Sequence, residues 1–276
     1  MLGNEAAVAD YHIHPDFSID ATGSVEDYCQ SALKKGLVEI CFTTHYDSNP
    51  DGQGNDRKMR IDGNIVPLSF GGIEKYVKAV LQAHEKYFGQ GLEVKCGIEV
   101  GYYPGCEAHI SELFAKFPFQ YRLGAIHDLD NICLCCQQRY ESCFGRFSLD
   151  KMADSYFALA ENAVRSGLFD AIAHVDVYKK YGLKYYGEDI LTAHRGRIES
   201  VFSAMSEHNV GMEINTSSLR RGHKEYYPSM EIINLARRLG VNISAIGSDA
   251  HTPDEVAYDF ETATAIAYEL FPYCDE

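Results

Sequence analysis

Short apolar runs rich in β-branched residues alternate along this chain with longer segments of helical periodicity. Seven of these runs are predicted strands, at residues 8–14, 38–44, 92–100, 121–127, 169–175, 210–216 and 241–249. Helices are predicted between and after them, at residues 24–35, 72–88, 107–116, 149–166, 188–208, 229–239 and 254–270. This alternation indicates parallel βαβ units with right-handed crossovers, wound into a barrel or an open sheet.

Several helices carry start or stop signals in the sequence. Ser24 followed by Asp27 predicts a capping box. Glycines that end helices follow four of the predicted segments, at Gly36, Gly89, Gly167 and Gly240. Residues 47–69 show almost no periodicity and are rich in Gly, Asp and Asn, so we expect a long functional or mobile loop there.

Composition narrows the class of protein. With 276 residues and 46% hydrophobic content, the chain fits one large α/β domain over residues 1–276. No apolar run reaches the length of about 18 residues that a membrane span needs, and residues 1–9 lack a signal-peptide pattern, so a cytoplasmic protein is expected. The net charge of −15 argues against a nucleic-acid partner. A small phosphorylated substrate stays possible, because bound metals invert the local field. The oligomeric state is also left open by the sequence.

Nine cysteines are scattered along the chain, and four of them gather at Cys133, Cys135, Cys136 and Cys143. A zinc or iron–sulfur site is the lesser interpretation, because the spacing lacks two CxxC arms. Free, reduced cysteines are the interpretation we favour.

Polar side chains that bind metals stand at the carboxyl ends of the predicted strands. They are His12 and His14, His45, Glu99, His127, His174, the stretch from Glu213 to Asn215, and Asp249 with His251. In a parallel α/β barrel these strand ends converge on one face. The pairs His12/His14 and Asp249/His251 are spaced i, i+2, so each pair projects to one side of an extended chain. One such residue alone would be an ordinary polar group, but the whole set predicts a metal cluster.

The number of donors indicates more than one metal ion. A single catalytic zinc uses three protein ligands and a water. Two or three ions that share a carboxylate would use the eight or nine protein donors found here. Mixed imidazole and carboxylate donors suit Zn, Fe or Mn. Such clusters catalyse hydrolysis, in which a metal-bridging hydroxide attacks in line at phosphorus.

An ordered set of motifs gives the chain a specific resemblance. They read DYHIHPDFS, TTHYD, GIEVGYYP, GAIHDL, AHVDVYKKYG, EINTSSLRRG and GSDAH, and they span residues 10–251. This set resembles the PHP (polymerase and histidinol phosphatase) superfamily, and in particular its histidinol-phosphate phosphatases. The resemblance implies a distorted (βα)7 barrel of the TIM-like type that holds a trinuclear metal centre and hydrolyses phosphate esters.

The resemblance also implies a ligand set for each metal. The first metal is expected at His12, His14, Glu99 and Asp249; the second at Glu99, His127 and His174; the third at His45, His251 and a residue on the loop after His14. Many relatives have a histidine at this loop position, where the present chain has Asp20. A carboxylate can still bind a borderline cation, so Asp20 is retained as a ligand.

Basic residues after the fifth and sixth strands are expected to bind phosphate by the same resemblance. The matching positions are Lys179, Lys180, Arg220 and Arg221, with Arg220 favoured as the clamp that stabilises charge on the phosphoryl oxygens. For each of them a solvated loop charge is the ordinary alternative. Asp249 or His251 is expected to give the leaving alcohol its proton.

The expected activity is hydrolysis of L-histidinol phosphate to L-histidinol and phosphate, a step of histidine biosynthesis. Three alternatives stay open from the sequence. The first is a PHP phosphoesterase acting on a nucleotide or a sugar phosphate. The second is an amidohydrolase-like enzyme that cleaves C–N bonds, which commonly uses a carboxylated lysine where this chain has Glu99. The third is a metal-binding protein without enzymatic activity.

Overall fold

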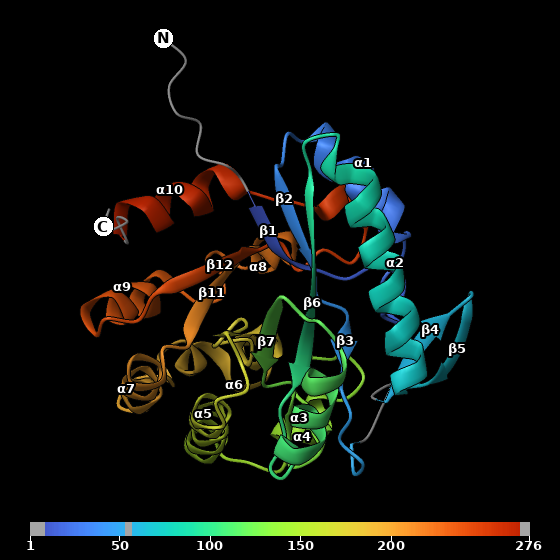
Figure 1. Ribbon diagram of the computed structural model, residues 1–276. Coiled ribbons are helices and arrows are strands. Elements are labelled where there is room, and N and C mark those ends of the chain that lie inside the picture. The colour runs from blue at the N-terminus through green and yellow to red at the C-terminus, as the bar shows by residue number, and fades with distance from the viewer. Residues whose placement is uncertain (1–8, 53–56, 271–276) are drawn as a thin grey trace.

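The computed structural model describes residues 9–52 and 57–270. Seven parallel strands follow one another in the order β1-β2-β6-β7-β10-β11-β12, and the short strand β3 joins the same sheet beside β6 (Figure 1). Their bounds are Ala9–Ile13 (β1), Glu39–Phe42 (β2), His45–Tyr46 (β3), Glu93–Gly101 (β6), Tyr121–Ala125 (β7), Ala171–Ile172 (β10), Gly211–Asn215 (β11) and Ile243–Gly247 (β12). Each predicted strand is present and parallel to its neighbours, so the predicted distorted (βα)7 barrel is confirmed.

The first and last strands meet and nearly close the barrel (Figure 1). The backbone N–H of His14 donates to the carbonyl oxygen of Ala250 at 2.9 Å. The buried carboxylate of Asp10 accepts hydrogen bonds from the backbone N–H groups of Ser248 and Ala257, both at 2.9 Å. A single carboxylate on β1 thus satisfies two backbone donors in the segment that follows β12, which a buried position requires.

Helices pack around the outside of the sheet (Figure 1). Their bounds are Val25–Lys34 (α1), Phe70–Phe88 (α2), Glu107–Lys116 (α3), Tyr140–Phe144 (α4), Leu149–Arg165 (α5), Lys179–Tyr186 (α6), Ile198–His208 (α7), Ser217–Arg220 (α8), Met230–Arg238 (α9) and Phe260–Leu270 (α10). The capping box of Ser24 and Asp27 at the start of α1 is confirmed. Among the helices of residues 9–52 and 57–270, each is too short or too polar to cross a membrane.

The segment 47–69 is not a plain loop, contrary to the sequence prediction. It contains an antiparallel hairpin of Lys58–Ile61 (β4) and Asn64–Pro67 (β5), which lies beside α2 (Figure 1). The turn between the strands is Asp62-Gly63, with φ of 51° and 78°. An Asp-Gly pair is a strong signal for a two-residue hairpin turn, because both residues tolerate positive φ.

Two predicted helices are shorter than their periodic segments. The segment 188–208 opens with a 3-10 turn at Gly187–Thr192, and α7 begins only after Gly196, whose φ is 75°. The segment 254–270 opens with a 3-10 turn at Pro253–Glu255, and α10 begins after Asp259, whose φ is 54°. A left-handed residue ends right-handed helical geometry, so each segment is divided at that point. Helix α6 was not predicted.

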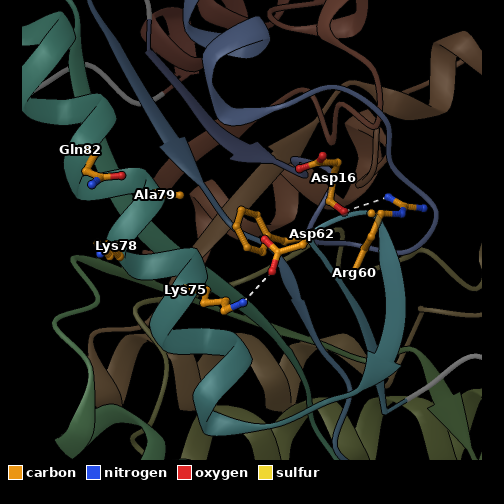
Figure 2. Close-up of a pocket in the computed structure, with 9 residues that line it drawn as sticks. Asp16, Arg60, Asp62, Lys75, Lys78, Ala79 and Gln82 are labelled. Carbon is orange, nitrogen blue, oxygen red and sulfur yellow. Dashed lines mark hydrogen bonds and ion pairs between the residues drawn. The ribbon is translucent and has the colours of Figure 1, made fainter.

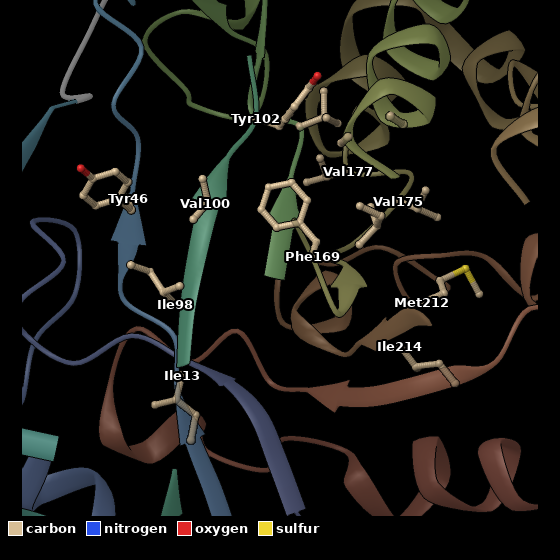
Figure 3. Packing of buried hydrophobic residues seen from close by; sticks show 14 of the residues in the cluster. Ile13, Tyr46, Ile98, Val100, Tyr102, Phe169, Val175, Val177, Met212 and Ile214 are labelled. Atoms are coloured by element: carbon tan, nitrogen blue, oxygen red, sulfur yellow. The ribbon is translucent and has the colours of Figure 1, made fainter. Parts of the chain in front are cut away.

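The side chains of the barrel strands alternate between two environments. Large apolar residues such as Ile98, Val100 and Ile214 pack in the layer between sheet and helices (Figure 3). On the opposite face, a second buried cluster consists mainly of smaller residues, among them Cys41 and Ala173. Glu99 lies between Ile98 and Val100 in sequence and therefore points to the barrel interior. Alternation along the strand thus places the carboxylate of Glu99 inside the barrel, while Ile98 and Val100 pack in the apolar layer outside it.

Candidate metal centre

All the strand-end residues assigned to metals by the sequence come together at the carboxyl end of the barrel. They lie at or just after the ends of their strands: His12 and His14 at β1, His45 on β3, Glu99 on β6, His127 after β7, His174 after β10, and Asp249 with His251 after β12. Their role as metal ligands stays a prediction, which the geometry below supports.

The carboxylate of Glu99 lies at the centre of the cluster and is fully buried. Its Oε1 lies 3.0 Å from Nε2 of His174, 3.3 Å from Nε2 of His127 and 3.5 Å from Nε2 of His12. One carboxylate oxygen therefore faces three imidazole nitrogens that come from three different strands.

Asp249 is the second carboxylate of the cluster. Its Oδ1 lies 3.3 Å from Nε2 of His14 and 3.8 Å from Nε2 of His12. Ser217 Oγ donates to its Oδ2 at 3.1 Å, which fixes the carboxylate from the side of α8. The pairs of residues from the first and last strands therefore do meet where the barrel closes.

Backbone geometry at two strand ends is unusual. His174 has a φ of 28° and Asp249 a φ of 51°. Residues other than glycine seldom adopt positive φ, and such positions concentrate at functional sites where the surrounding structure enforces them. Both side chains are thereby turned toward the cluster at the point where the strand ends.

A further group of ring nitrogens that could share one ion comes from the buried His14 and the more exposed His45 and His251. His45 Nδ1 also lies 2.7 Å from Oε2 of Glu99. Asp20, on the loop after β1, places its Oδ2 3.4 Å from Nε2 of His251 and 3.8 Å from Nε2 of His45. Below, His12, Glu99 and His174 are called the inner half of the cluster, and His45, His251 and Asp20 the outer half.

Two further carboxylates hold the imidazoles in place and were not assigned to the site from the sequence. Glu213 Oε1 lies 2.6 Å from Nδ1 of His12, and its Oε2 accepts the backbone N–H of His174 at 2.8 Å. Asp47 Oδ1 lies 3.0 Å from Nδ1 of His127. A carboxylate on the far nitrogen of a metal-binding histidine fixes the ring and its tautomer.

The sequence carries a signal for Glu213. Glu213 stands two positions before Asn215, on the same face of β11, and it belongs to a strand end already marked as polar. Glycines make room for the two carboxylates: a Cβ on Gly247 would lie 2.0 Å from Oε1 of Glu213, and one on Gly101 would lie 2.1 Å from Oδ1 of Asp47. These contacts join distant segments, so spacing alone does not reveal them.

Charge in the cluster is strongly coupled. Burial opposes charge on His12, but its carboxylate neighbours, Glu213 first, outweigh that effect and raise the pKa of His12 well above its ordinary value. Burial also opposes charge on His45, where Glu99 raises the pKa to about 9. Burial would raise the pKa of Glu99, yet the imidazoles around it hold that pKa well below its usual range. The cluster therefore attracts positive charge, for which protons and metal cations compete.

The donor set fits divalent metal ions. Four overlapping groups of three donors have their ligand atoms within 4.8 Å of one another, and they draw on His12, His14, His45, Glu99, His127, His174, Asp249 and His251. Nε2 of His12, Nε2 of His14 and Oε2 of Glu99 are buried without a hydrogen-bond partner among the described residues. A buried polar atom without a partner is costly, and a metal ion would satisfy these atoms.

The four basic residues predicted to bind phosphate differ in their surroundings. Lys179 is buried, with its Nζ 2.8 Å from Asp176 Oδ2 and 3.1 Å from Ser229 Oγ. The guanidinium of Arg220 donates to the carbonyl oxygens of Ser248 (2.7 Å) and Asp249 (3.0 Å) and so braces the end of β12.

Arg221 and Lys180 are less enclosed than Lys179. Arg221 Nη1 lies 3.8 Å from Oδ2 of Asp249, and its side chain is one-third exposed. Lys180 extends over the ring of Tyr181. Lys179 and Arg220 thus have structural partners already, and phosphate binding by any of the four stays a prediction.

The cysteine group lies next to the metal centre but is separate from it. Cys133 Sγ is 3.6 Å from Cys135 Sγ, on and just after the short hairpin of Asp128–Leu129 (β8) and Ile132–Cys133 (β9). Cys135 Sγ is 3.9 Å from the carbonyl oxygen of His127. The metal-competent groups found among residues 9–52 and 57–270 include no cysteine, and Cys133, Cys135 and Cys143 are free thiols.

Buried imidazoles and carboxylates at the carboxyl ends of a parallel α/β barrel define a candidate hydrolase with a polynuclear metal centre. Residues 10–217 match the family model described as the PHP domain, and the chain belongs to this family.

Several characterised or named relatives are similar over nearly their full length. A Deinococcus radiodurans protein named "Probable histidinol-phosphatase" is 30% identical over 261 residues, 93% of this chain and 91% of that protein. The histidinol-phosphatase of Bacillus subtilis is 25% identical over 268 residues, 91% of this chain and 96% of that protein. The crystal structure of histidinol phosphate phosphatase from Lactococcus lactis, complexed with Zn, L-histidinol and phosphate, superposes with a TM-score of 0.76 at 19% identity, covering 96% of this chain and 94% of that chain. This structural likeness confirms the barrel fold.

Proposed function

We propose that this protein is a metal-dependent phosphomonoesterase that hydrolyses L-histidinol phosphate to L-histidinol and phosphate. The observation that carries the proposal is the buried carboxylate of Glu99, which faces imidazoles from several strands in a family whose similar members bear the name histidinol-phosphatase. The zinc, histidinol and phosphate of the Lactococcus lactis complex support the same substrate and metal class.

The ligand assignment is the one that the family resemblance implies, and all of its residues except Asp20 belong to groups of donors that lie close together in the structure. His12, His14, Glu99 and Asp249 would hold one ion. A second would lie between Glu99, His127 and His174, and a third between His45, His251 and Asp20. Imidazole and carboxylate donors accept Zn, Fe(II) or Mn, and zinc has the support of the relative's complex. Two or three ions per chain are therefore proposed.

When bound, such ions supply Lewis-acid stabilisation of the phosphoryl oxygens and lower the pKa of water. The chain's own residues do the rest. Arg221, whose guanidinium faces Asp249 from the less enclosed side, is placed to neutralise charge on the phosphate. Arg220 acts through the main chain of Ser248 and Asp249, which it holds in position.

Hydrolysis forms a bond from a water oxygen to phosphorus and breaks the bond from phosphorus to the alcohol oxygen, which must then receive a proton. His251 and Asp249 are the candidate donors. His251 Nδ1 lies 2.9 Å from the carbonyl oxygen of Asp249, an arrangement that orients its Nε2 toward Asp20 and the opening of the cluster.

Steady-state kinetics with Zn, Mn and Fe(II) test the proposed function. We expect kcat/KM for L-histidinol phosphate to exceed that for p-nitrophenyl phosphate and for a nucleoside monophosphate by at least about a hundredfold. Equal kcat/KM values for all three compounds would be consistent with a phosphatase but would contradict L-histidinol phosphate as its specific substrate.

The variant Glu99→Gln keeps the shape of the side chain and removes its charge. Because a metal centre supplies several kcal/mol of transition-state stabilisation, we expect a loss of about a thousandfold in kcat/KM. Arg197→Ala, which removes ion pairs to Asp150 and Asp154 at the surface and a hydrogen bond to the carbonyl oxygen of Ala193, is the matched control and should keep full activity. An active Glu99→Gln enzyme would contradict the proposed centre.

A further inference from the structure

Arg60 lies on strand β4, outside the histidine cluster. Its guanidinium is engaged with the loop that follows β1 (Figure 2). Nη1 donates to the carbonyl oxygens of Asp16 (2.8 Å), Ser18 (3.1 Å) and Ala21 (2.8 Å), and Nη2 donates to that of Ile19 (2.6 Å). The backbone N–H of Arg60 donates to the carbonyl of Phe17 at 2.9 Å.

These bonds enclose the one loop that carries Asp20. Four carbonyl oxygens, three before Asp20 in the sequence and one after it, accept hydrogen bonds from a single planar cation. The loop is therefore curled around the guanidinium. The carboxylate of Asp20, on this loop, faces His251 and His45. The loop is also tied to the cluster by Ser18, whose Oγ accepts the backbone N–H of His45 at 3.1 Å.

The hairpin that bears Arg60 is itself anchored. Met59 is buried and packs against Gly72 of α2, where an added Cβ would lie 2.2 Å from its sulfur. Lys75 of α2 forms an ion pair with Asp62 in the hairpin turn at 2.7 Å (Figure 2). A path of direct contacts therefore runs from α2 through the hairpin to the loop after β1.

The chemistry requires an arginine at this place. A guanidinium has five N–H donors in a rigid plane, whereas a lysine ammonium has three donors at a single point. Lysine keeps the charge but cannot address four carbonyls arranged around a plane. Without the guanidinium, the carbonyl groups of residues 16–21 turn to water, and the backbone that holds Asp20 loses its fixed course.

We propose that Arg60 is a positioning residue for the outer metal site: it fixes the loop of residues 16–21 so that Asp20 completes the donor set of His45 and His251. This inference rests on the proposed metal-dependent function, and it assigns to the β4–β5 hairpin a role in metal occupancy. Arg60 acts only through the loop and contacts neither metal nor substrate.

Zinc content and kinetics of four variants test the proposal. Wild type, Arg60→Lys, Arg60→Ala, Asp20→Ala and the double variant Arg60→Lys/Asp20→Ala are loaded with Zn and dialysed, and bound zinc is measured by mass spectrometry. We expect the Arg60 variants and Asp20→Ala each to lose one ion per chain, with affinity for that ion falling about 10- to 100-fold. The double variant should bind zinc at the outer site no more weakly than Asp20→Ala alone does, because Arg60 acts through Asp20. Excess zinc should restore kcat in Arg60→Lys.

Lys75→Ala is the matched control, because it breaks the hairpin's ion pair at the surface and leaves the guanidinium bonds in place. It should retain the wild-type zinc content. The proposal is overturned if Arg60→Lys keeps the full zinc content, if Asp20→Ala does so, or if the two effects multiply in the double variant. Should Arg60→Ala fail to fold, Arg60→Lys decides. Zinc content is independent of turnover, so a protein that binds zinc as expected but does not hydrolyse histidinol phosphate contradicts only the proposed function.

Discussion

The inner and outer halves of the histidine cluster are built in different ways. In the inner half, the side chains of His12 and Glu99 are fully buried and that of His174 is 5% exposed. In the outer half, exposure rises to 22% for His45, 19% for His251 and 57% for Asp20. The inner donors stand on strand ends, whereas Asp20 stands on a loop.

The supports differ as well. Glu213 holds the inner half through one side-chain and one backbone contact, both buried. The outer half relies on Ser18 and on the guanidinium of Arg60, which hold a loop by its main chain. Rigid strands position side chains more firmly than loops do, so the inner half should bind metal more tightly and tolerate change less.

Complete removal of metal should have the largest effect. An ion bound at a hundred times its Kd contributes about 2.7 kcal/mol to the free energy of unfolding. We expect a chelator to remove the outer ion first and the inner ions at higher concentration, with the thermal midpoint falling at each stage. Metal analysis and calorimetry across a chelator series give the measurement. Loss of all ions in one step would show that the two halves are not distinct.

The variant Glu213→Gln should affect the inner half next most strongly. It leaves the buried Nδ1 of His12 beside a neutral amide and removes the charge that favours this ring orientation. Loss of such a supporting carboxylate costs about 10- to 100-fold in metal affinity or activity. Competition with a chelator, compared with Glu231→Gln on the exposed face of α9, measures it. An unchanged inner affinity would mean that packing alone holds His12.

The smallest effect is expected from Asp20→His, which replaces a carboxylate oxygen donor by an imidazole nitrogen. Because imidazole suits zinc better than one carboxylate oxygen does, we expect the outer ion to bind up to about tenfold more tightly. The inner ions should be unaffected. Zinc titration followed by mass spectrometry separates the two, and a change confined to the inner ions would contradict the assignment of Asp20.

Much of this molecule could be predicted from sequence because the information is local. Side chains alternate between the two faces of a strand, so the sequence predicts that Glu99 and the residue pairs of the first and last strands lie on the interior face of the barrel. The structure places them there. The Asp62-Gly63 turn residues of the hairpin are likewise a local signal. The division of helix 188–208 depends on left-handed backbone, for which only Gly196 gave a signal.

What could not be predicted depends on contacts between distant segments. Glu213 meets His12 across 201 positions of the chain, and Arg60 meets Ile19 across 41. Spacing carries no record of such pairs. The burial of Lys179 against Asp176 likewise depends on the tertiary structure. The single-domain organisation over residues 1–276, the cytoplasmic location and the lack of a nucleic-acid partner stay predictions.

The closure of the barrel by Asp10 has a consequence for how the protein is made. The first strand contributes His12 and His14, but their partners Asp249 and His251 are synthesised almost at the end of the chain, and Asp10 accepts the hydrogen bonds of Ser248 and Ala257 only once these residues are present. During translation the earlier histidines therefore wait as an incomplete set. The complete donor set can therefore form only after residue 251 has been synthesised and the last strand has joined the first.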